Sequence, residues 1–200
     1  MNSTLKVIIG FNNYKMCNNY TVAGCTTIEF GHNLAGIVND TETHIVSYGI
    51  ASQTSAWTGM DIEPAYDTSQ HTLDLIDRFT LYDTSFADFV DYGSAESGYW
   101  TDPNIYQAAY GRTYDFPLPQ IYLNGNITNW LRVYANGGSY ASQGTITDCP
   151  HIPTGSSTMD WAPSTAWNNW YNALVSHNYA SNPMNHSTDI GGYSTACGNF

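Results

Sequence analysis

Short apolar segments alternate with stretches of helical periodicity along this chain, and the alternation is the feature that most constrains its fold. Strands are predicted at Val7–Phe11, Thr58–Glu63, Phe86–Asp91, Ile105–Tyr110, Pro119–Leu123, Gln143–Thr147 and near Thr188–Ile190. Helices are predicted at about 33–48, behind the N-cap residues at 67–69, at 127–134 and after Pro163-Ser164. Strands that alternate with helices favour parallel βαβ units.

The number and spacing of these elements favour a barrel over a sandwich. Six or seven strands in a single domain of 200 residues predict an α/β fold of the TIM-barrel-like (β/α)₈ type, small or incomplete. A doubly wound sheet is the alternative, but the phosphate-binding G-x-G-x-x-G that often accompanies it is absent from the sequence.

The charge balance excludes some classes of partner. With 5 Lys+Arg against 17 Asp+Glu, the formal net charge is −12, whereas a nucleic-acid binder needs a basic face.

No run approaches the ~18 apolar residues of a membrane span, and no signal peptide is visible. Lysine occurs only at 6 and 15, and Asn, Ser and Thr form the polar surface. We expect a secreted, extracellular protein whose leader is missing from this sequence, with a carbohydrate as its partner.

Four cysteines also bear on the compartment. Their number is even, and their spacing is not that of a zinc site. If the protein is secreted, the expected disulfides are Cys17–Cys25 and Cys149–Cys197. The alternative is four buried thiols in a reducing cytosol.

The stretch from Trp57 to Pro64 contains the most informative residues. Residues two apart in a strand share a face, so Asp61 and Glu63 should point one way while Met60 and Ile62 pack against helices. Two neighbouring acids repel, which raises one pKa, and a protonated acid beside an ionised partner is what glycosidic bond cleavage requires. Alternatively, the two acids bind backbone amides, cap the next helix, or bind a metal or other ligand.

Other strand ends could contribute to the same site. Asp91 is a candidate second carboxylate, or else it caps the turn at Gly93. Tyr110, Gln120 and Tyr122 would face the same barrel mouth and bind sugar hydroxyls, unless they are core residues.

Aromatic residues in loops are candidates for stacking on a sugar ring. Trp100 and Trp161 lie in predicted loops, where such a platform is conceivable. The six histidines form no H-x-H or H-E-x-x-H pattern, and no G-x-S-x-G elbow occurs. We therefore expect neither a metal site nor a cofactor.

The acidic strand resembles that of glycoside-hydrolase barrels such as the chitinase-like and lysozyme-like families. A closer resemblance is to uncharacterised secreted bacterial proteins regarded as glycoside-hydrolase-like barrels. It covers residues 7 to about 190 and rests on Val7–Gly10, Asp61–Glu63, Asp91–Gly93, Pro117–Tyr122 and Trp167–Leu174. The resemblance implies a barrel and a strand-end Glu that acts on a sugar. Those relatives often have an acid where this chain has Gln120.

Two classes of function follow. The first is a secreted hydrolase of polysaccharide or peptidoglycan, with Glu63 as proton donor and Asp61 or Asp91 as its partner. The second is a non-catalytic extracellular protein that binds carbohydrate or assembles on a surface, as a homo-oligomer or larger array.

Overall fold

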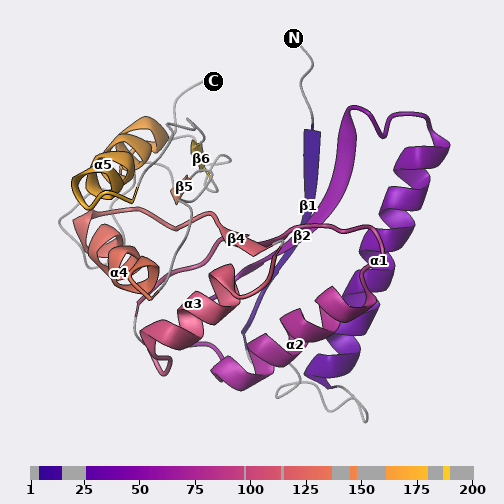
Figure 1. The fold of residues 1–200 in the computed structure, drawn as a ribbon, viewed down its shortest axis with the longest axis horizontal. Coiled ribbons are helices and arrows are strands. Elements are labelled where there is room, and N and C mark those ends of the chain that lie inside the picture. The colour runs from indigo at the N-terminus through magenta and orange to yellow at the C-terminus, as the bar shows by residue number, and fades with distance from the viewer. Residues whose placement is uncertain are drawn as a thin grey trace.

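The structure is a computed structural model that describes residues 5–14, 26–96, 98–113, 115–136, 145–147, 161–179 and 187–189. Strands and helices alternate through this part of the chain (Figure 1). In chain order they are β1 (Leu5–Asn12), α1 (Thr27–Ser47), β2 (Thr54–Asp61), α2 (Ser69–Tyr82), β3 (Phe89–Asp91), α3 (Asp102–Tyr110), β4 (Asp115–Pro117), α4 (Asn124–Tyr134), β5 (Thr145–Thr147), α5 (Pro163–Ser176) and β6 (Ser187–Asp189).

Four of the strands form one parallel sheet in the order β1-β2-β3-β4, and β5 and β6 form a separate parallel pair. In the larger sheet Asn12 pairs with Asp61, Met60 with Asp91, and Asp91 with Pro117. The carboxyl ends of these strands therefore meet at one edge, which we call the carboxyl edge.

This topology corrects the expected barrel. A (β/α)₈ barrel closes eight strands into a ring, whereas the described residues have four strands in one open sheet and two in another. The TIM-barrel prediction is therefore wrong, and the protein is an α/β protein with a small open sheet. The order also lacks the reversal of the doubly wound alternative, because neighbouring strands follow the sequence.

The strands predicted at Val7–Phe11, Thr58–Glu63 and Phe86–Asp91 correspond to β1, β2 and β3 of one sheet, although their bounds differ. β3 is shorter than predicted and begins at Phe89 because the segment before it is a tight loop. The Asp83 carboxylate accepts hydrogen bonds from the backbone of Ser85 and Ala87, and Phe86 has a φ of 57°, which a strand does not allow. The fourth strand lies at Asp115–Pro117 rather than at 119–123.

Residues 105–110, predicted as a strand, form α3 instead. The Asn104 side chain accepts hydrogen bonds from the Thr101 backbone and hydroxyl, which caps the helix. Ile105, Ala108 and Ala109 are fully buried at helical spacing. A short apolar run fits a strand or a buried helix equally well, and here the cap decides.

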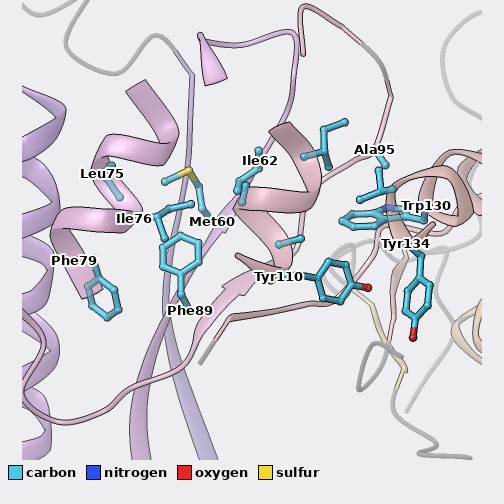
Figure 2. Packing of buried hydrophobic residues seen from close by; sticks show 14 of the residues in the cluster. Met60, Ile62, Leu75, Ile76, Phe79, Phe89, Ala95, Tyr110, Trp130 and Tyr134 are labelled. Atoms are coloured by element: carbon cyan, nitrogen blue, oxygen red, sulfur yellow. The ribbon is translucent and has the colours of Figure 1, made fainter. Parts of the chain in front are cut away.

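The helices pack against one another in sequence order, α1 on α2, α2 on α3, α3 on α4 and α4 on α5. α2 begins as predicted, since the Thr68 hydroxyl accepts from the His71 backbone. The alternate residues Met60 and Ile62 of the β2 segment are fully buried with Ile76 and Phe89 in the core beneath these helices (Figure 2).

Two glycines of α1 give a matched test of this packing. A Cβ at Gly31 would lie 2.3 Å from the Leu75 carbonyl oxygen of α2, whereas a Cβ at Gly36 would meet nothing within 4 Å. We expect Gly31→Ala to lower the free energy of unfolding by about 1–3 kcal/mol through overpacking. Gly36→Ala should raise it by about 0.5–1 kcal/mol through helix propensity. Urea unfolding of both variants measures this, and two stabilised variants would contradict the close α1–α2 contact.

Candidate functional site

The carboxyl edge of β2 presents two acids on one face of the sheet. Met60 and Ile62 are fully buried beneath the helices, while Asp61 and Glu63 alternate with them and are half-buried. Because side chains alternate along a strand, burial of one set leaves the other set on the opposite face. The alternation expected from the sequence is thus observed for these four residues.

Asp61 is held by Gln120, a residue that follows the edge strand β4. The Gln120 side-chain amide donates a hydrogen bond of 2.7 Å to Asp61 Oδ1. Gln120 follows β4 and is itself fixed by its backbone N–H, which donates to the Gly93 carbonyl. Burial raises the pKa of the Asp61 carboxyl, and the Gln120 hydrogen bond opposes that rise.

Glu63 is fixed through both its backbone and its carboxylate. The fully buried Asn13 donates from Nδ2 to the Glu63 carbonyl at 3.1 Å and accepts from the Glu63 N–H at 2.8 Å. The Ser94 hydroxyl donates to Glu63 Oε2 at 2.7 Å. Burial raises the pKa of Glu63, Ser94 opposes the rise, and the charges of Asp61 and Glu96 add to it.

Both acids are held by neutral donors rather than by cations. The ion pairs formed by the described residues lie elsewhere, at His71–Asp67, Arg112–Asp77, Arg112–Asp115 and Arg132–Asp102. A cation within a few ångströms would lower a carboxyl pKa. Hydrogen bonds from an amide and a hydroxyl fix the geometry while burial keeps each pKa raised.

Tyr92 lies across two glycines on the same face as the acids. Gly10 and Gly59 are paired across β1 and β2, and a Cβ at Gly10 would meet the Tyr92 hydroxyl oxygen at 2.3 Å. That hydroxyl donates to the Phe11 carbonyl at 2.9 Å. Burial, with a contribution from the Asp61 charge, raises the pKa of Tyr92 to about 12, so the phenol remains a proton donor.

Asp91 lies on the helix-covered face. It pairs with Met60 in the register, so the two side chains share a face, and Asp91 is fully buried. Its Oδ1 accepts from the Gly93 N–H at 3.0 Å. Asp91 therefore caps the turn at Gly93, which was the alternative to a role as second carboxylate. Its Oδ2 is buried without a hydrogen-bond partner among the described residues. Burial raises the pKa of Asp91 well above the usual range, and the hydrogen bond from Gly93 opposes the rise.

Two of the aromatic candidates lie in the core. Tyr110 is on α3, not on a strand, and its ring packs against Tyr106 and Tyr134 (Figure 2). Trp100 is buried, and its indole N–H donates to the Asp67 carbonyl at 2.8 Å. Neither residue is a surface platform.

The other two aromatic candidates lie beyond Gln120. Tyr122 and Trp161 are half-buried, and the backbone N–H of Trp161 donates to the backbone carbonyl of Tyr122 at 3.1 Å. The Tyr122 N–H is bound by the Asn126 side chain at the start of α4. This part of the chain is therefore tied to the helix layer, whereas Gln120 reaches Asp61.

Of the residues that hold the acids, sequence reasoning named Gln120 but missed Asn13 and Ser94. Asn13 directly follows β1 and Ser94 lies three residues after β3, so the signal available was a polar residue near the end of each strand. Tyr92 alternates with Asp91, and the paired glycines that accommodate it are recognisable only once the strand order is known.

Comparison with known proteins gave no match to a protein-family model, a curated protein or a solved structure. The resemblance to glycoside-hydrolase-like proteins therefore stays a hypothesis. In the described part of the chain, no cluster of three or more His, Cys, Asp or Glu could hold a metal, and no helix combines the length and apolar character needed to cross a membrane. All four cysteines, and with them the expected disulfides, lie outside the described residues.

The raised pKa of Asp91 predicts a pH dependence of stability. A carboxyl whose pKa is higher in the folded than in the unfolded state stabilises the fold at low pH, and that contribution is lost as pH rises through the folded pKa. Asp115, whose pKa burial raises to about 7, acts in the same direction. We expect the free energy of unfolding to fall from about pH 4 upward, by at most about 1.4 kcal/mol per pH unit for each proton.

Asp91→Asn should flatten that slope, because asparagine keeps an oxygen for the Gly93 N–H and has no proton to lose. Urea unfolding across pH measures the slope, and Asp40→Asn, at an exposed position of α1, is the matched control. A wild-type slope in Asp91→Asn would mean that Asp91 is ionised in the folded protein.

Proposed function

We propose that the protein is a glycoside hydrolase that cleaves a polysaccharide or peptidoglycan at the carboxyl edge of its sheet. The observation that carries this proposal is the pair Asp61 and Glu63, which share one face, are both half-buried, and are each held by a neutral hydrogen-bond donor. Their raised pKa values suit acid catalysis, which needs a carboxylic acid that keeps its proton near the working pH.

The contacts of the two acids suggest which role each plays. Glu63 has negative neighbours in Asp61 and Glu96, and both favour its protonated form. Asp61 accepts from the Gln120 amide and Glu63 from the Ser94 hydroxyl, and each bond favours the ionised form, so the charges of Asp61 and Glu96 on Glu63 are what distinguish the two acids. Glu63 is therefore the proposed general acid, and Asp61 the ionised partner that stabilises the positive charge developing on the sugar or activates a water.

The position of the acids supports the same proposal. Open α/β sheets bind their ligands beyond the carboxyl ends of the strands, and Asp61 and Glu63 lie at that edge of β2. The net charge of −12, together with hydrogen-bond donors that are neutral, disfavours an anionic substrate. A neutral sugar chain satisfies these conditions. The proposal also includes that the protein is secreted and that its partner is an extracellular polymer.

Asp91 is not assigned a catalytic role in this proposal. It is fully buried and caps the turn at Gly93, so it cannot contact a substrate in this conformation. Burial raises the pKa of Asp91, and the charges of Asp61 and Glu63 add to that rise.

A second candidate function is assembly with other chains without catalysis. β1 is an edge strand in the described sheet, and Leu5, Val7 and Ile8 on it are exposed. An exposed apolar edge strand is a template for pairing with another chain. Light scattering of the purified protein that shows large ordered assemblies, together with no turnover on any polymer, would favour this alternative.

Substitution of the two acids tests the hydrolase. On a panel of chitin, peptidoglycan and plant and fungal glucans, Glu63→Gln should lower kcat about 10²–10⁴-fold because the general acid is lost. Asp61→Asn should also lower it strongly. Glu29→Gln and Asp40→Asn, at exposed positions of α1, are matched controls that should keep wild-type rates. Wild-type turnover in Glu63→Gln would refute the assignment.

Ser94→Ala tests the role of Glu63 through the pH profile. The Ser94 hydroxyl stabilises ionised Glu63, so its loss should raise the pKa of Glu63 further. A general acid works while protonated, and the alkaline limb of kcat/KM should therefore move to higher pH. Ser176→Ala, at an exposed position of α5, is the control. Movement of the acidic limb instead would make Glu63 a base or nucleophile.

A further inference from the structure

Two tyrosines form an exposed aromatic pair beside the acids. Tyr14 follows β1 and Tyr66 follows β2, and these strands are paired so that Asn12 lies opposite Asp61. The ring centroids of the two tyrosines are 5.2 Å apart, and the rings are edge-to-face at 88°. The residues are 51% and 39% exposed, so the pair presents aromatic surface to solvent.

Hydrogen bonds fix the backbone of both tyrosines, and that of Tyr66 is bound to Glu63 itself. The Glu63 carbonyl accepts from both the Tyr66 N–H at 2.9 Å and Asn13 Nδ2 at 3.1 Å. The Tyr14 N–H donates to Asn12 Oδ1 at 3.0 Å. The Tyr66 backbone is thus tied to that of Glu63 and the Tyr14 backbone to Asn12, which limits the entropy that a ligand contacting the acid and the rings would cost.

The acids also affect the phenol of Tyr66, whose backbone is bound to that of Glu63. Burial raises the pKa of Tyr66, and the charges of Glu63 and Asp61 raise it further. Both contributions have the sign expected of carboxylates that share the carboxyl edge with Tyr66.

We propose that Tyr14 and Tyr66 form a binding subsite for a neutral pyranose ring of the substrate chain, next to the bond that Glu63 cleaves. This inference rests on the proposed function. The C–H face of a pyranose is apolar and slightly positive, and it complements the negative face of an aromatic ring. Its hydroxyls can then bond to the carboxyls of Asp61 and Glu63.

The charges around the pair discriminate among ligands. Asp61 and Glu63, in their ionised forms, repel an anionic polymer that approaches the tyrosines. A quaternary ammonium ion would also be attracted to an aromatic pair beside carboxylates, and that attraction weakens at a pH where Glu63 is protonated. A neutral sugar chain is the ligand whose binding depends least on the ionisation of Glu63.

The experiment measures binding apart from turnover. In a Glu63→Gln background, isothermal titration with cellohexaose and chitohexaose gives Kd without hydrolysis. Tyr66→Ala should weaken Kd about tenfold, as expected for loss of one stacked ring, and Tyr14→Ala less so. Tyr66→Phe and Tyr66→Trp should keep affinity because they keep the ring, and they control for misfolding. Tyr48→Ala, at an exposed position after α1, should have no effect.

The outcomes separate the two proposals. Ring-dependent binding without wild-type turnover supports the subsite and refutes the hydrolase. Wild-type turnover with an unchanged KM in Tyr66→Ala, or equal oligosaccharide affinity with and without the ring, refutes the subsite and leaves the hydrolase standing. Absence of oligosaccharide binding, or ring-dependent binding of choline or polygalacturonate instead, also overturns the subsite.

Discussion

Burial of one face of β2 is the constraint on which the rest of the site depends. Ala56, Thr58, Met60 and Ile62 have almost no exposed surface beneath the helix layer. Since side chains alternate along a strand, a slip of one residue would turn this set outward and bury Asp61 and Glu63 instead. The free-energy cost of burying two carboxyls without cations makes that slip unfavourable, so the hydrophobic core also determines where the acids lie.

The site uses neutral hydrogen bonds where many proteins use ion pairs. Arginines of the described chain are engaged in the helix layer, such as Arg112 with Asp77 and Asp115. At the carboxyl edge, an asparagine, a serine and a glutamine hold the acids. This arrangement fixes the geometry of both carboxyls while burial raises their pKa values. In the role proposed for Glu63, a raised pKa suits proton donation to a neutral ligand.

The sequence predicted the parts that depend on local pattern. Alternation in the β2 segment, the cap of α2 at Thr68 and the strands around β1 and β3 were recognisable from neighbouring residues. The prediction of a strand at 105–110 was wrong, because six mostly apolar residues fit the repeat of a strand and that of a buried helix equally well. The barrel was wrong because the number of strands in one sheet depends on which segments pair, and no local pattern specifies that.

The amino-acid sequence by itself determined that the chain alternates strands and helices and that Asp61 and Glu63 share a face, because both follow from the side-chain periods of the backbone. Only the tertiary structure decided what surrounds those acids. Asn13 lies 50 residues before Glu63, Ser94 31 after it, and Gln120 59 after Asp61. These residues meet because parallel pairing brings the carboxyl ends of the strands to one edge, and contacts across such separations leave no periodic signal in the sequence.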